Sequence, residues 1–176
     1  MSKPAQLSRR RFISKSAAAG AVVPLFVSSG VLAEPGKPGA NDRIQVGLIG
    51  AGGMGRANLK NCTQHDDVAV TGICDVWKER RETAAAEHGG KPKLYNDYRE
   101  LLDQKDVDAV IIASPPHWHA LMAINACEAG KDIYLQKPMT LHLAESLAVM
   151  GAVKKHGRIS QVGTQIHAGE NYHRVV

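Results

Sequence analysis

The sequence of 176 residues is poor in aromatic side chains, which make up 5% of it, and it has three cysteines. None of these, Cys62, Cys74 and Cys127, belongs to a CxxC pair or a Cys/His cluster. Cys74 falls in an apolar stretch predicted as a strand and Cys127 in a predicted helix, where small buried thiols are common. We therefore expect structural cysteines, with neither a disulfide framework nor a metal site.

Acidic residues are absent from residues 1–33, which hold five of the 22 lysines and arginines. The rest of the chain has 17 basic and 17 acidic residues, so the formal net charge of +5 comes from the N-terminal segment. Residues 34–176 carry no excess positive charge, so they offer no electrostatic basis for binding a polyanion. The sequence therefore predicts no nucleic-acid partner.

The apolar run from Ser16 to Leu32 is short and interrupted by glycine, proline and serine, so it predicts no stable membrane anchor. It follows Ser8-Arg9-Arg10-Arg11-Phe12-Ile13. This order is typical of a twin-arginine signal, an address read by the machinery that exports folded proteins. Residues 1–33 are therefore interpreted as a signal peptide for the periplasm or another extracytoplasmic compartment, with a disordered basic tail as the alternative. Residues 34–42, rich in proline and glycine, are expected to form a linker.

From Arg43 onward short apolar runs alternate with helical stretches. The predicted strands are Ile44–Ile49, Val68–Cys74, Leu94–Tyr95, Val107–Ala113, Ile133–Leu135 and Ile159–Val162. The predicted helices are Met54–Asn61, Trp77–His88, a short helix capped by Asp97 that reaches Leu102, His119–Ala129, and a helix capped by Thr140 that reaches His156. The last of these is expected to turn Leu143, Leu147 and Met150 toward the core. The alternation predicts right-handed crossovers and an α/β fold with a doubly wound parallel sheet, here residues 43–165.

A glycine-rich segment lies between the first predicted strand and the first helix. It reads Gly50-Ala51-Gly52-Gly53-Met54-Gly55 and fits the GxGxxG pattern of Rossmann folds. Gly50 permits a tight turn, Gly52 lets the backbone approach a pyrophosphate, and Gly55 lets helix and strand pack closely. The helix start then offers free N–H groups to phosphates. The segment predicts a dinucleotide site, against the alternative of a glycine-rich turn without a ligand.

Asp75 directly follows the second predicted strand, 25 residues after Gly50. A carboxylate at this position hydrogen-bonds the adenosine ribose hydroxyls and repels the extra phosphate of NADP, which favours NAD. Lys78, Arg80 and Arg81 lie close enough in sequence to receive that phosphate, so NADP stays the alternative.

Two further segments follow predicted strands, at the edge where open α/β sheets bind ligands. One reads Ala113-Ser114-Pro115-Pro116-His117-Trp118-His119 and the other Gln136-Lys137-Pro138. With the glycine loop and Asp75, these segments resemble the glucose–fructose oxidoreductase/inositol dehydrogenase (Gfo/Idh/MocA) family, from about Arg43 to the last residue. In that family one segment lines the cofactor, and the other brings a lysine beside the nicotinamide and the substrate hydroxyl. The resemblance implies cofactor contacts from Ser114, Pro115, Pro116, His119, Gln136, Pro138 and Gln165, and a catalytic role for Lys137.

The chain departs from the family pattern at Gln136, where the family has a glutamate. Glutamine can still hydrogen-bond a ribose hydroxyl, but it removes a negative charge beside Lys137. That loss disfavours the protonated lysine and would suit a base near neutral pH. The change could equally mark a homologue whose chemistry has drifted. His117 is left without a role, since two imidazoles with no nearby acid or thiol make a poor metal site.

The resemblance implies a second α+β substrate domain, and residues 166–176 read as the opening of it. On that interpretation the chain is truncated and inactive alone, and homo-oligomerisation of a full-length protein is left open. For that protein we expect hydride transfer between nicotinamide and a secondary alcohol of a sugar, cyclitol or polyol. The alternatives are a glycosidase that uses bound NAD transiently and a non-catalytic dinucleotide or sugar sensor.

Overall fold

A computed structural model gives the fold, and it describes residues 38–39 and 42–164. The predicted signal peptide and Gln165 lie outside the described residues, as do most of the linker and residues 166–176. Within the described part no helix is both long and apolar enough to cross a membrane.

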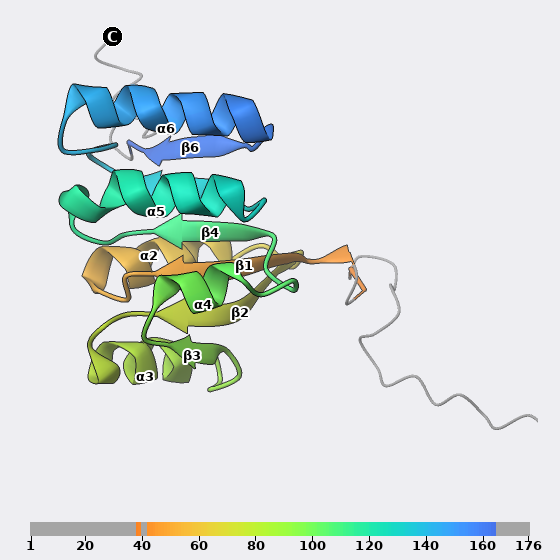
Figure 1. Ribbon diagram of the computed structural model, residues 1–176. Coiled ribbons are helices and arrows are strands. Elements are labelled where there is room, and N and C mark those ends of the chain that lie inside the picture. Colours follow the sequence, from red (N-terminus) through yellow and green to blue (C-terminus); the bar gives the residue numbers. More distant parts are fainter. Residues whose placement is uncertain (1–37, 40–41, 165–176) are drawn as a thin grey trace, which may run out of the picture.

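Six parallel strands form one sheet, in the order β3-β2-β1-β4-β5-β6 (Figure 1). The strands are β1 (Ile44–Ile49), β2 (Val68–Cys74), β3 (Lys93–Tyr95), β4 (Ala109–Ile112), β5 (Asp132–Gln136) and β6 (Ser160–Gly163). The helices are α2 (Gly53–Cys62), α3 (Lys78–Glu87), α4 (Tyr98–Leu102), α5 (Pro116–Glu128) and α6 (Leu143–His156). The predicted doubly wound parallel sheet is thus confirmed.

The strand order reverses between β1 and β4, where successive crossovers begin to run in opposite directions. Right-handed crossovers then put α2 and α3 on one face and α4, α5 and α6 on the other. Figure 1 shows α2 and α4 on opposite sides of the strands. Such a reversal opens a crevice at the carboxyl ends of the two central strands, where ligands bind in open α/β sheets.

Each face of the sheet has its own hydrophobic cluster because side chains alternate along a strand. Val46 and Leu48 of β1 pack with residues of α2 and α3, whereas Ile49 packs with residues of α4 and α5. On β4, Ile111 belongs to the first cluster and Val110 to the second. Burial on both faces explains why these strands read as nearly continuous apolar runs.

Several predicted helix ends are confirmed. The side chain of Asp97 caps α4 by accepting a hydrogen bond from the backbone N–H of Arg99 at 2.9 Å. Gly157 ends α6 in the left-handed conformation, with φ of 61°, which glycine adopts without steric cost. α5 begins at Pro116, three residues before the predicted start, because proline fits the first turn of a helix.

The predicted inward stripe of α6 is wrong. Leu143, Leu147 and Met150 are 78%, 60% and 58% exposed, while Val149 is buried and Val153 half-buried against the core. The predicted cap is wrong as well, since His142 caps α6 and Thr140 donates its hydroxyl to the carbonyl of His142. α6 packs beside α5 near the β6 end of the sheet. This contact buries the stripe of Val149 and Val153, which lies about one residue away from the predicted stripe of larger side chains.

Candidate dinucleotide site

The glycine loop leads from β1 into α2 through a turn that has no room for a side chain at Gly50 or Gly55. Gly50 has φ of +93°, and its N–H donates to the carbonyl of Cys74 at 2.8 Å. A Cβ at Gly50 would lie 2.7 Å from the carbonyl carbon of Ala113. A Cβ at Gly55 would lie 1.9 Å from the carbonyl oxygen of Gly50. The loop therefore holds the start of α2 against β1 and β4, with the free N–H groups of the first turn at the sheet edge.

The carboxylate of Asp75 fastens this loop to the end of β2. Its Oδ2 accepts the backbone N–H of Ala51 at 2.8 Å, and its Oδ1 accepts the N–H of Trp77 at 2.9 Å. Asp75 is 9% exposed, so its charge is held largely out of water by these two donors. Each carboxylate oxygen retains acceptor capacity for a ribose hydroxyl.

A cavity of about 600 Å³ opens beside the loop and Asp75. Its walls come from the carboxyl ends of β1, β2 and β4 and from α4 and α5, so it lies at the reversal of strand order. It is lined by Ile49, Gly50, Gly52, Cys74, Asp75, Val76, Arg80, Asn96, Asp97, Tyr98, Arg99, Ala113, Ser114, Pro115, Trp118 and Met122. Its volume falls within the usual range of ligand pockets, which run from about 300 to 1,000 Å³.

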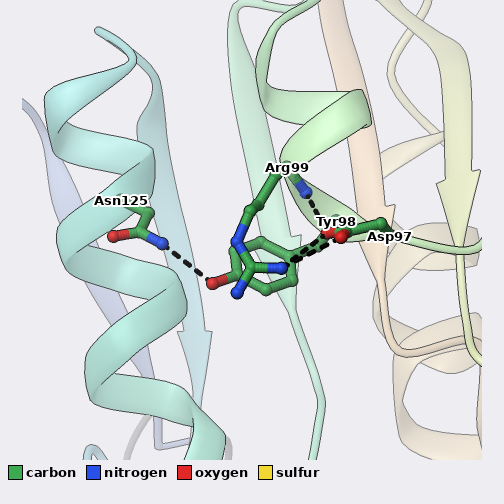
Figure 2. A network of polar contacts seen from close by, with 4 residues as sticks. All are labelled: Asp97, Tyr98, Arg99 and Asn125. Carbon is green, nitrogen blue, oxygen red and sulfur yellow. Dashed lines mark hydrogen bonds and ion pairs between the residues drawn. The ribbon is translucent and has the colours of Figure 1, made fainter.

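The far wall of the cavity is a polar network at the start of α4 (Figure 2). Asn125 of α5 donates to the hydroxyl of Tyr98 at 2.8 Å and so ties α5 to α4. The guanidinium of Arg99 lies over the ring of Tyr98 and pairs with Asp97 at 2.9 Å. The backbone N–H of Arg99 donates to Asp97 and lowers the pKa of that carboxyl.

The three cations that follow Asp75 are placed differently. Arg80 lines the cavity and stacks over the ring of Trp77 at 4.7 Å from its centroid. Arg81 donates to the carbonyl of Asp75 and to the side chain of Asn96, and Lys78 pairs with Glu82 on the surface. Of the three, only Arg80 therefore faces the space that an extra ribose phosphate would enter.

A second group of predicted site residues gathers at the ends of β4 and β5. His119 is 1% exposed, and its ring nitrogens lie 2.8 Å from the carbonyl oxygen of Pro138 and 2.7 Å from that of Ser114. Gln136 is 5% exposed, and its Oε1 accepts the backbone N–H of Lys137 at 2.6 Å. The Lys137–Pro138 peptide bond is cis, and the Lys137 side chain is exposed.

Two polar atoms in this group are buried without a hydrogen-bond partner among the described residues, the hydroxyl of Ser114 and Nε2 of Gln136. Buried polar atoms are normally satisfied, so these two atoms are free to bond a ligand or water at this site. Because β4 and β5 are neighbouring parallel strands, the two atoms belong to adjacent strand ends. A glycine cradle for phosphates, an acceptor for ribose and two orphaned polar groups together fit a dinucleotide.

The predicted cofactor and catalytic residues thus form two groups, one that lines the cavity and one beside it at the ends of β4 and β5. Gly50, Gly52, Asp75, Ser114 and Pro115 line the cavity, whereas His119, Gln136, Lys137 and Pro138 do not. Ser114 belongs to both, since its carbonyl contacts His119. Gly53 and Met54 are exposed at the start of α2, and Pro116 begins α5.

Sequence reasoning missed the α4 wall and two residues of α5, Trp118 and Met122. Asn96 and Asp97 directly follow β3, so the rule that ligands meet strand ends could have found them. Trp118 and Met122 are spaced four apart on α5 and share a face, but the sequence does not say what that face meets.

Comparisons with known proteins agree with this geometry. The model of the oxidoreductase family with an NAD-binding Rossmann fold, GFO_IDH_MocA, matches residues 44–164. The scyllo-inositol 2-dehydrogenase (NAD(+)) of Bacillus subtilis is 38% identical over 122 residues, which cover 69% of this chain and 35% of that protein. A glycosyl hydrolase family 109 protein of Shewanella pealeana is 31% identical over 171 residues, covering 85% of this chain and 38% of that protein.

Among solved structures, an NAD-binding protein from Listeria innocua matches with a TM-score of 0.67 at 34% identity. The match covers 73% of this chain and 37% of that one. The chain thus spans little more than a third of the length of these relatives.

Proposed function

The chain belongs to the Gfo/Idh/MocA oxidoreductase family with an NAD-binding Rossmann fold, and from that premise we propose that the full-length protein oxidises a secondary alcohol of a sugar, cyclitol or polyol. The proposal follows the polyol substrate named for the B. subtilis relative. Bound NAD would supply the hydride acceptor.

The observation that carries the proposal is the position of Lys137 relative to the two orphaned polar atoms. Gln136 ends β5, Ser114 follows the end of the adjacent strand β4, and exposed Lys137 comes directly after Gln136. Ser114 and Gln136 would hold the ligand at this edge through their free hydroxyl and amide groups. Lys137 would then accept the proton of the substrate hydroxyl as the carbon-bound hydride leaves.

The cavity would bind the adenosine half of the ligand. Asp75 would accept hydrogen bonds from the ribose, and the first turn of α2 would meet the phosphates. Of the three cations that follow Asp75, Arg80 is the one that would tolerate the additional phosphate of NADP. The carboxylate of Asp75 opposes it, and NAD is the cofactor that we assign.

The test is NADH formation by the full-length protein on a panel of cyclitols, aldoses and polyols. We expect steady turnover on at least one of them. Lys137→Ala should lower kcat at least about a hundredfold, the lower range for general acid–base catalysis, and leave the Kd for NAD nearly unchanged. Lys78→Ala, on the surface of α3, is the matched control. Unchanged turnover in Lys137→Ala would exclude this role and favour a binding protein without catalysis.

A second candidate function has support from the glycosyl hydrolase family 109 relative, which aligns with 85% of this chain. In a glycosidase the cofactor would be restored within each cycle, so NADH would not accumulate. Release of a chromophore from an aryl glycoside without added NAD would support that function. Steady NADH production from free sugars would argue against it.

We further propose that residues 1–33 direct export of the folded protein. The support is the run Arg9-Arg10-Arg11 before a modest apolar segment, in a region without acidic residues. Residues 1–42 fused to a folded reporter should send it out of the cytoplasm, and replacing all three arginines by lysine should retain it. Equal export by both fusions would contradict the proposal.

A further inference from the structure

The aromatic rings in and beside the cavity differ in what covers them. The guanidinium of Arg80 lies over Trp77, 4.7 Å from the ring centroid, and that of Arg99 lies over Tyr98 at 4.9 Å (Figure 2). No cation lies over the ring of Trp118 among the residues that the structure describes. Trp118 lines the cavity and is 41% exposed, so it presents an uncovered aromatic surface to the ligand space.

The position of Trp118 is fixed by the start of α5. This helix begins at Pro116, and the backbone N–H of Trp118 donates to the carbonyl of Pro115 at 2.9 Å. Met122 follows one helical turn later and lines the same cavity. The ring of His117 is tilted by 47° against that of Trp118, with 6.2 Å between the centroids, so the two rings are not stacked. The first turn of α5 therefore holds Trp118 at the cavity with its ring available for a planar ligand group.

Val76 lines the cavity from the other side of the crevice. It is 84% exposed and follows the end of β2, whereas Trp118 follows the end of β4. β2 and β4 are the two neighbours of β1 in the sheet, so the two side chains stand on either side of the crevice above β1. Apolar side chains that are exposed together in a cavity are typical of a ligand site.

The part of the ligand that reaches this place follows from the proposed function, on which this step rests. There Asp75 binds the ribose of the adenosine half, and the first turn of α2 meets the phosphates. The adenine base and the carbon that carries the phosphate are attached at opposite ends of the ribose ring. The base is therefore directed away from the glycine loop and toward the wall that α4 and α5 form.

We propose that Trp118 is the platform on which the adenine of NAD stacks, with Val76 against the other face of the base. Every base has a π-face, and its stacking on an aromatic side chain needs no hydrogen bond to the base. Arg80 and Arg99 are stacked on rings of their own, so they leave the ring of Trp118 to the base. Trp118 thus contributes to binding of the adenine half and takes no part in the chemical step.

The platform is tested on the full-length protein with ADP-ribose, which carries the adenine half of the cofactor and cannot accept a hydride. Loss of a stacked aromatic side chain weakens binding of a base by about fivefold to more than a hundredfold. We therefore expect Trp118→Ala to raise the Kd for ADP-ribose and the Kd for NAD by the same factor, at least about fivefold. Trp118→Phe keeps a ring and should raise both constants less than about threefold. Trp118→Leu keeps an apolar side chain without a ring and should resemble Trp118→Ala in calorimetry.

A second measurement reports on the stack itself. Contact with a base quenches the fluorescence of indole, so saturating ADP-ribose should quench the tryptophan emission of the wild type. Most of this change should be absent from Trp118→Phe. Leu121→Ala is the matched control, because Leu121 is an exposed apolar residue of α5 that does not line the cavity. This variant should bind ADP-ribose, and be quenched by it, as the wild type is.

Equally tight binding of ADP-ribose by Trp118→Leu and Trp118→Phe would overturn the platform, since burial without stacking would then explain the affinity. Undiminished quenching in Trp118→Phe would overturn it as well, because the base would lie elsewhere. If no sugar or polyol is oxidised while ADP-ribose binding still depends on the ring of Trp118, the proposed function fails and the platform stands. If the wild type does not bind ADP-ribose, the platform and the cofactor assignment both fail.

Discussion

The carboxylate of Asp75 accepts the backbone N–H of Ala51 at 2.8 Å across 24 residues of sequence. Its other oxygen accepts the N–H of Trp77 at 2.9 Å. The residue predicted to select the cofactor therefore also fixes the glycine loop that would hold the cofactor's phosphates. Ribose recognition and phosphate binding are thus joined through one buried side chain.

This relationship predicts that Asp75→Asn is nearly as damaging as Asp75→Ala. An amide has one acceptor oxygen, so its NH₂ group would face one of the two N–H donors. We expect both variants to lose about 2 kcal/mol of unfolding free energy, the cost of an unsatisfied buried donor. We also expect at least tenfold weaker NAD binding. Denaturant titration and calorimetry measure these effects, with exposed Asp66→Asn as the control. Wild-type stability in Asp75→Asn would contradict the two-donor role.

The glycine loop predicts opposite effects for two substitutions two residues apart. Gly55→Ala places a Cβ 1.9 Å from the carbonyl oxygen of Gly50, so α2 must move away from the loop. We expect a loss of about 3 kcal/mol in unfolding free energy, at the upper end for overpacking, and loss of NAD binding. A Cβ at Gly53 meets nothing within 4 Å, and Gly53→Ala should leave stability equal or raised. Equal melting temperatures for the two variants would contradict the close packing.

Gln136→Glu tests the departure from the family pattern. A carboxylate next to Lys137 favours the protonated lysine, so a reaction that needs the free amine would require a higher pH. We expect the rising limb of the pH–rate profile to move upward in pH. Gln104→Glu, at the other edge of the sheet, controls for added charge. An unmoved limb would contradict a base whose charge state depends on residue 136.

Cys74 provides a prediction from its pKa. Burial, with a smaller contribution from the charge of Asp75, raises the pKa of this thiol from 9.0 to about 12. The folded state thus favours the thiol over the thiolate, and this contribution to stability is complete below pH 9 and declines between about pH 9 and 12. Iodoacetamide at pH 8.5 should modify half-buried Cys62 before Cys74, as measured by mass spectrometry. Equal reactivity in the folded protein would contradict the burial, whereas equal reactivity in denaturant is expected.

The buried and exposed faces of α6 can be compared by one substitution on each. Val149 is 1% exposed and Leu147 is 60% exposed. In the 176-residue chain, Val149→Ala should lower the unfolding free energy by about 2 kcal/mol through a cavity, and Leu147→Ala by less than about 0.5 kcal/mol. A larger loss from Leu147→Ala would show that another part of the chain covers this stripe.

The strands and most helix ends could be predicted because local signals and tertiary packing agree. β1 and β4 are apolar on both faces, Asp97 caps α4, and Gly157 stops α6. α6 could not be oriented, since two apolar stripes lie one residue apart and only the presence of α5 selects between them. The α4 wall was missed although β3 and the cap of α4 were predicted, because the sequence does not show that α4 and α5 close over the carboxyl ends of β1 and β2.

The sequence by itself determined the order of strands and helices, the glycine turn and the residues that end the central strands. These depend on backbone conformation and hydrophobic period, which are local properties. Only the tertiary structure decided that Asp75 holds the glycine loop and that Tyr98 and Arg99 enclose the cavity. It also decided that His119 joins Ser114 to Pro138. Each of these contacts joins residues from different elements, and the crossover topology that brings them together is set by packing of the whole sheet.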